Sequence, residues 1–168
     1  IALDNLMEIA PAMKRKWKPV KESIAKNCRK YLWDAKLQRF IPHIYLEGSP
    51  FPADFNEKKI YYFGGTPIAI QADLLSKAEV KISIDEMVKR VKQAGGPSIG
   101  LTLYPPYPDK FFANPIMNPV YSYQNGGDWT WFGGRMIQQL IRYGFIEGAY
   151  REIYPMVSTD RVQECFND

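Results

Sequence analysis

The chain has 168 residues, of which 46% are hydrophobic and 24% are charged, and its net charge is +4. This composition is typical of a globular chain and excludes intrinsic disorder, and the length fits one domain or a piece of a larger one. The charge is mild and no glycine-rich phosphate loop or RNA-binding motif is present, so we expect no nucleic-acid partner.

Metal, cofactor and membrane signals are missing from the sequence. Cys28 and Cys165 lie far apart and neither belongs to a CxxC pair, so the sequence predicts neither a disulfide scaffold nor a metal site. No uninterrupted apolar run is long enough to span a membrane. We therefore expect no cofactor, no metal and no membrane partner, and the compartment stays open.

Two helices are predicted at the N-terminal end of the sequence. Apolar residues recur at roughly helical spacing over residues 1–15, and a second helix is expected with Pro19 in its first turn, continuing to Trp33. We expect the two to pack as an antiparallel hairpin. Residues 39–66 then change period and predict short extended segments around a proline-rich loop.

A second pair of helices is predicted between residues 66 and 94. Thr66 and Pro67 are expected as the N-cap and first residue of one helix, ending near Leu75. Ser83 and Glu86 fit a capping box at the start of the other, which Gly95 should end. Residues 98–124 follow as a long loop rich in proline and aromatic residues, and a loop of this length is unusual unless it is functional.

The last predicted pair begins after a sharp turn. Asp128 is expected as the N-cap of a helix that reaches Tyr143, and Gly144 should stop that helix. A further helix is expected from Ile146, with Pro155 interrupting or ending it. The plan is three helix pairs with an irregular β insertion, which predicts a mainly α fold and argues against a parallel sheet.

The turn between the long loop and the penultimate helix is the strongest functional signal. Glycine reaches positive φ without penalty, so Asn125, Gly126 and Gly127 predict a tight bend that presents polar groups and aromatic rings. Flat rings suit the faces of a pyranose and fixed polar groups suit its hydroxyls. We expect one of the two indoles to be buried and the other to face a pocket. The predicted sugar-binding residues are Tyr123, Gln124, Asn125, Gly126, Gly127, Asp128, Trp129 and Trp131.

Residues 123–129 resemble a motif of the six-hairpin glycosidases, in particular the Tyr-His-Asn-Gly-Gly-x-Trp-Pro of neutral invertases. Residues 29–34 are similar to the Arg-x-Tyr-x-Trp that ends an outer helix in that family. Gln124 stands where the family has His and Thr130 where it has Pro, so sucrose specificity is not carried over. The resemblance implies about three of the six hairpins of an (α/α)6 toroid, a single partial catalytic domain over residues 1–168.

The resemblance further implies a glycoside hydrolase-like activity on an oligosaccharide, inverting by general acid and base, with both catalytic carboxylates outside this chain. The alternatives are a non-catalytic carbohydrate-binding or scaffold domain and a glycoside phosphorylase. Half a toroid would expose an apolar face, to be covered by missing barrel segments or by another chain.

The carboxylates and the histidine of this chain are further candidates for catalytic groups. Asp128 has the best position, but its expected roles are to cap a helix and to contact a ligand. His43, the only histidine, is expected in a packed or surface position on a strand. The other carboxylates in expected loops, more easily explained as surface residues, are Asp34, Glu47, Asp54 and Asp109.

Overall fold

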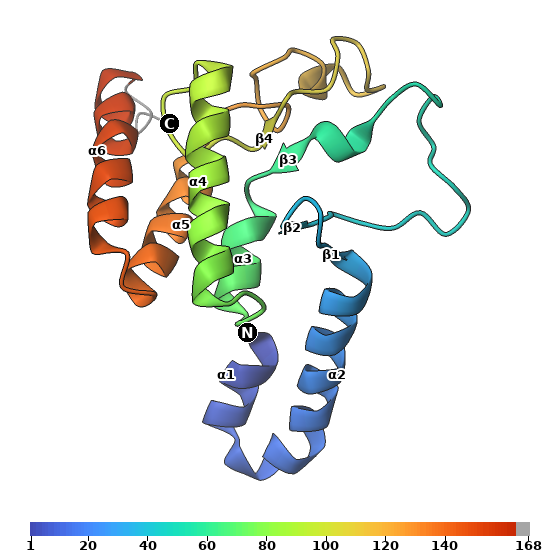
Figure 1. Ribbon diagram of the computed structural model, residues 1–168, viewed down its shortest axis with the longest axis vertical. Helices are drawn as coiled ribbons and strands as arrows, with labels where there is room; N and C mark the ends of the chain where they lie inside the picture. The colour runs from blue at the N-terminus through green and yellow to red at the C-terminus, as the bar shows by residue number, and fades with distance from the viewer. Residues whose placement is uncertain (164–168) are drawn as a thin grey trace.

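The computed structural model describes residues 1–163 and shows a mainly helical protein, which confirms the predicted fold class (Figure 1). The (α/α)6 toroid itself stays a prediction. The helices of the protein are α1 (Ala2–Ile9), α2 (Lys14–Leu32), α3 (Gly65–Gln71), α4 (Lys77–Ala94), α5 (Thr130–Arg142) and α6 (Ile146–Gln163). Short antiparallel pairs join β1 (Trp33–Asp34) to β2 (Arg39–Phe40) and β3 (Tyr61–Tyr62) to β4 (Leu103–Tyr104). Single turns of 3-10 helix lie at Pro11–Met13, Glu57–Lys59 and Pro115–Met117.

Helices α1 and α2 form the expected hairpin, which projects from the rest of the molecule (Figure 1). Lys21 Nζ lies 2.6 Å from Asp4 Oδ1 and ties the two helices together. Pro19 lies inside α2, five residues after its start, so its predicted place in the first turn is wrong. Neither helix contains a buried residue, and the hairpin therefore lies outside the hydrophobic core.

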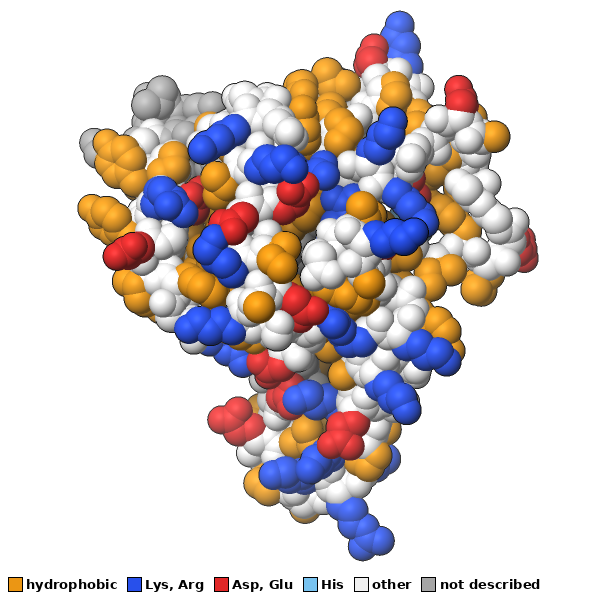
Figure 2. Space-filling model, in the orientation of Figure 1, with side chains coloured by type: hydrophobic (Ala, Val, Ile, Leu, Met, Phe, Trp, Pro, Cys, Tyr) orange, Lys and Arg blue, Asp and Glu red, His pale blue; other side chains and the backbone are white. Residues whose placement is uncertain are grey.

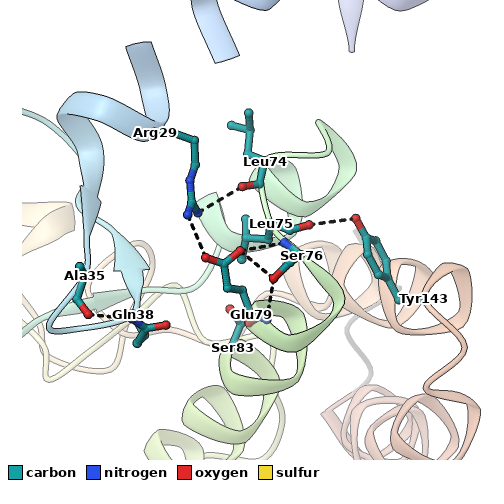
Figure 3. A network of polar contacts seen from close by, with 9 residues as sticks. All are labelled: Arg29, Ala35, Gln38, Leu74, Leu75, Ser76, Glu79, Ser83 and Tyr143. Carbon is teal, nitrogen blue, oxygen red and sulfur yellow. Dashed lines mark hydrogen bonds and ion pairs between the residues drawn. The ribbon is translucent and has the colours of Figure 1, made fainter. Parts of the chain in front are cut away.

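Arg29 joins this hairpin to the main body (Figure 3). Its guanidinium lies 4.1 Å from the centre of the Trp33 ring, Nη2 donates to Glu79 Oε1 over 2.9 Å, and Nη1 donates to the carbonyl of Leu74 over 3.3 Å. Glu79 also accepts from the backbone N–H of Ser76 over 2.8 Å. The arginine of the Arg-x-Tyr-x-Trp segment and the cap of α4 thus meet on one carboxylate.

The capping box of α4 lies seven residues, about two helical turns, before its predicted position. Ser76 is the N-cap and exchanges hydrogen bonds with Glu79, whereas Ser83 is buried inside the helix and donates from Oγ to the Glu79 carbonyl over 2.8 Å. The Ser-x-x-Glu pattern occurs at both places. The second is interior to the helix because α4 has already begun at Lys77, and Val80 and Ser83 both lie on its buried face. The predicted box at Ser83 and Glu86 is therefore wrong, while Gly95 ends α4 at φ 63° as expected.

The core lies where α3, α4, α5 and α6 meet β3 and β4. Close backbone approach is built in at Gly64, because a Cβ there would lie 2.5 Å from the Phe132 ring. The largest fully buried apolar side chains are Tyr61, Phe63, Ile70, Met87, Ile99, Met136 and Leu140. This core, which spans residues 61–156, gives the α5 N-terminus a rigid base, and a smaller cluster around Ile60, Leu103 and Tyr107 lies beside it.

Helices α5 and α6 form an antiparallel hairpin (Figure 1) around Gly144, which has φ 78° and ends α5 as expected. Helix α6 runs through Pro155 to Gln163, so the predicted interruption there is wrong. One face of α6 is apolar and exposed, and Figure 2 shows hydrophobic side chains along this edge. This stripe consists of Ile146, Tyr150, Ile153, Tyr154 and Val157, all at helical spacing. Within residues 1–163 no helix is both long and apolar enough to cross a bilayer.

Candidate functional site

The predicted turn at residues 121–129 is present and tightly bonded. The N–H of Tyr121 donates to the carbonyl of Asn125 over 2.8 Å, and the N–H of Asn125 donates to that of Ser122 over 2.9 Å. Gly126 has φ 92°, and a Cβ on Gly127 would lie 2.4 Å from the Tyr123 carbonyl oxygen. The two glycines are thus needed for different reasons, one for backbone conformation and the other for space.

Residues 98–102 hold this turn against the core. The N–H of Thr102 donates to the Gly127 carbonyl over 2.9 Å, and the N–H of Trp129 donates to the Gly100 carbonyl over 2.7 Å. The Asp128 carboxylate accepts from the Ser98 N–H over 3.0 Å and from Ser98 Oγ over 2.9 Å. The prediction that Asp128 caps α5 is wrong, because the N-cap is Trp129 and Asp128 anchors the neighbouring segment instead.

The amide of Asn125 faces inward. The residue is fully buried, its Oδ1 accepts from the Tyr107 N–H over 2.8 Å, and its Nδ2 donates to the carbonyls of Tyr107 and Asn118 over 3.1 Å and 3.4 Å. The side chain therefore pins the long loop to the turn. The expectation that this amide points toward a ligand does not agree with the geometry.

Three predicted aromatic residues lie at the surface instead. Tyr123 is 44% exposed, Trp129 is 38% and Trp131 is 54%, so the expected burial of one indole is wrong. Trp129 Nε1 donates to the Tyr123 carbonyl over 3.1 Å and the two ring centres are 5.4 Å apart. The Arg135 guanidinium lies 4.3 Å from the Trp131 ring centre. We call Tyr123, Trp129 and Trp131 the aromatic ledge; Gln124 beside them is also exposed.

The other loop carboxylates considered from the sequence do not gather at the ledge. Asp34 accepts from the N–H groups of Lys36 and Leu37 over 2.9 Å and 3.0 Å and stabilises its own turn. Glu47, Asp54 and Asp109 are exposed in loops, as their surface interpretation expects.

A second polar cluster, centred on Glu57, was not predicted from the sequence. Its carboxylate accepts from the hydroxyls of Tyr45 and Tyr62 over 3.0 Å and from that of Tyr107 over 2.9 Å. His43 Nε2 lies 3.2 Å from Glu57 Oε1 and 2.6 Å from the Tyr45 hydroxyl. These groups are up to 64 positions apart in the sequence, so no local motif marks the cluster.

Burial and hydrogen bonding act in opposite directions on the Glu57 carboxyl. Partial burial raises its pKa, but the hydroxyls of Tyr107, Tyr45 and Tyr62 and the nearby His43 together hold the pKa below its ordinary value. The same burial, with the carboxylate alongside, raises the pKa of Tyr45 to about 12. Glu57 is therefore a charged anchor surrounded by neutral hydroxyl donors.

A cavity of about 280 Å³ lies beside this anchor. It is bounded by β2, by the following proline-containing segment and by the 3-10 turn that holds Glu57. Its polar lining comes from Arg39, His43, Tyr45, Ser49, Glu57 and Lys58, and its apolar lining from Phe40, Ile41, Pro42, Ile44 and Ile60. In the described part of the chain, no group of three or more His, Cys, Asp or Glu residues could hold a metal ion.

Comparison with known proteins gives no assignment: no protein-family model, curated protein or solved structure matches this chain.

Replacing Glu57 by glutamine is expected to remove part of the pH dependence of stability. Because the pKa of Glu57 is lower in the folded state, its contribution is fully present above the unfolded value of about 4.3 and is lost as pH falls through the folded pKa. Urea unfolding of the wild type and E57Q between pH 7 and pH 3 measures it. The free-energy gap between the two should shrink on acidification; a gap that stays constant would contradict the assignment.

Proposed function

We propose that this chain is the sugar-binding part of a glycoside hydrolase-like protein, and that the aromatic ledge receives the sugar. The supporting observation is the exposure of two large rings, Tyr123 and Trp129, on one short, tightly bonded turn and of a third, Trp131, in the first turn of α5. Exposed rings stack on the apolar faces of pyranoses, and a rigid support limits the entropy lost on binding. Gln124 lies beside the rings and supplies an amide for sugar hydroxyls.

The backbone at the ledge supports the same proposal. Tyr121 has φ 58° and Tyr123 has φ 44°, a region that bulky residues rarely adopt. Such conformations persist where the surrounding structure enforces them, and they concentrate at binding sites. The backbone conformation at these two tyrosines thus lowers the stability of the turn, because glycine would adopt the same φ without a steric penalty.

Catalysis, in this proposal, depends on carboxylates outside the chain, as the resemblance to six-hairpin glycosidases implies. Asp128 is the carboxylate nearest to the ledge in sequence, and Ser98 already occupies both of its oxygens. We also propose that further hairpins of a toroid or another chain cover an apolar face of this chain. The exposed apolar stripe on α6 supports this proposal.

Titration of the chain with a panel of gluco-, galacto-, manno- and rhamno-configured disaccharides, followed by tryptophan fluorescence, tests the proposal. We expect a spectral shift that saturates, and about tenfold weaker binding for Trp129→Ala and Trp131→Ala, the loss of one aromatic contact. Tyr31→Ala is the matched control, because Tyr31 is equally exposed (54%) but lies on α2. Absence of binding across the panel, or an equal loss in the control, would contradict the ledge.

The alternative is a domain that binds sugar without turnover. It is favoured because Ser98 already donates hydrogen bonds to both oxygens of Asp128, the carboxylate nearest to the ledge in sequence. Incubating the full-length protein, with the segments proposed to carry the catalytic carboxylates, with the sugars that bind, in the presence and absence of inorganic phosphate, separates the classes. Release of monosaccharide without phosphate identifies a hydrolase, and dependence on phosphate identifies a phosphorylase. Binding without either product supports the non-catalytic alternative.

A further inference from the structure

We propose that the cavity beside Glu57 binds a small organic anion with an apolar body, such as an aromatic carboxylate. This site is separate from the aromatic ledge and is built from β2, residues 41–49 and the turn at Glu57–Lys59. Three observations carry the proposal: the spare donors of Arg39, the filled acceptors of Glu57 and the apolar walls.

Arg39 brings a positive charge without a direct ion pair to the cavity. Its residue is only 8% exposed, and it forms no ion pair among the residues whose side chains are described. Nη2 donates to the Lys58 carbonyl over 2.5 Å, which uses one of five N–H donors. The hydrogen bonds of the described residues give the remaining N–H groups of Arg39 no acceptor, and the residue lines the cavity, so these donors are open to a ligand there.

Glu57 cannot serve as a receptor for a cation. Its carboxylate is surrounded by the hydroxyls of Tyr45, Tyr62 and Tyr107 and by His43 Nε2, which also hydrogen-bond one another and together enclose the acceptor oxygens. The carboxylate keeps its charge, but its acceptor oxygens already lie against protein groups. The cavity is left with spare donors and no spare carboxylate acceptor, a balance that selects an anion.

The remaining walls specify an apolar body. Phe40, Ile41, Pro42, Ile44 and Ile60 line the cavity around the polar groups. A volume near 280 Å³ lies at the lower end of small-molecule sites, and such sites combine apolar walls with few directional polar groups. A fully hydrated ion such as phosphate would leave these walls without a partner. An arylcarboxylate places its charge on Arg39 and its ring against them.

Titration of the full chain with benzoate, followed by the backbone amide signals in heteronuclear NMR, tests the site. We expect saturable shifts confined to residues 39–49 and 57–60, with a dissociation constant on the order of 1 mM for a ligand of this size. Benzamide, which has the same ring without the charge, should bind at least tenfold more weakly. Inorganic phosphate should cause no saturable shifts. Equal affinity for benzoate and benzamide, or shifts spread over the surface, would overturn the proposal.

Variants at Ile44 separate charge from shape. This residue lines the cavity but is 48% exposed, so its replacement leaves the fold intact. Ile44→Asp and Ile44→Asn have almost the same volume and differ in charge. The aspartate variant should weaken benzoate binding at least fivefold relative to the asparagine variant and leave benzamide unchanged. Equal benzoate affinities for the two variants would refute an anion site.

Arg39→Met gives a second, independent test by removing the guanidinium. If this variant keeps the wild-type circular dichroism spectrum, benzoate binding should be lost, and retained binding would overturn the proposal. If the variant unfolds, the Ile44 pair decides. Addition of the sugars that bind the ledge should leave the benzoate affinity unchanged, so that failure of one site is distinguishable from failure of the other.

Discussion

Replacing Asn125 by alanine is expected to lower the free energy of unfolding by about 2–4 kcal/mol, because a fully buried amide would be lost together with its partners. The N–H and carbonyl of Tyr107 and the carbonyl of Asn118 would remain without the side-chain bonds that they now share. Urea unfolding at pH 7, monitored by circular dichroism, measures the change. The long loop should also become more sensitive to proteolysis.

Gln124→Ala is the matched control for this experiment. Gln124 is the adjacent residue and carries the same functional group, but it is exposed. Its replacement should change the unfolding free energy by no more than about 0.5 kcal/mol. A similar cost for both variants would show that the inward amide of Asn125 is not what stabilises the turn.

Gly127→Ala is expected to destabilise the protein by about 2–3 kcal/mol, the range for overpacking a site that cannot relax. A Cβ at this position would lie 2.4 Å from the Tyr123 carbonyl oxygen and 2.9 Å from its backbone nitrogen. Both obstacles are backbone atoms, so the turn itself must open. Thermal unfolding measures the loss, and sugar binding at the ledge should weaken with it.

Gly134→Ala should have the opposite sign. Gly134 lies inside α5, and a Cβ there would meet no atom within 4 Å. Alanine stabilises a helix interior by about 0.5–1 kcal/mol relative to glycine. If both substitutions proved neutral, steric space at Gly127 would not determine the geometry of the turn.

The helical content was predictable because it depends on local signals. Apolar periodicity identified the three pairs of helices, and Gly95 and Gly144 were correctly predicted as helix ends. Some errors concern helix boundaries: the helix predicted to start after Thr66 and end near Leu75 is α3, which has Gly64 as its N-cap and ends at Gln71. Other errors concern residues whose effect depends on tertiary context. Pro155 does not end α6, and Ser83 resembles a cap in sequence although the preceding helical turn makes it interior.

The orientation of the turn residues was less predictable. The diglycine bend follows from the residue types, but the direction of the Asn125 amide depends on a loop that has its own backbone groups to satisfy. Residues 98–124 contain few regular hydrogen-bonded elements, so a buried side chain fills that need. Nothing local in the sequence distinguishes such an amide from one that faces a ligand.

The Glu57 cluster could not have been found from spacing. Tyr107 lies 50 positions after Glu57, and its hydroxyl reaches the carboxylate only because the long loop folds back over the aromatic side chains of residues 51–62. Tyrosines in loops were visible in the sequence, but their common partner was not. Convergence of this kind is a property of the tertiary fold.

The joint at Arg29 has a consequence for how the molecule opens. Because α1 and α2 contribute nothing to the core and are joined to α4 largely through one guanidinium, their opening leaves the packing of residues 61–156 intact. Amides in this arm should exchange with deuterium well before those of α4 and α5, since local opening needs less free energy than global unfolding. The arm and the body are thus expected to behave as two cooperative units.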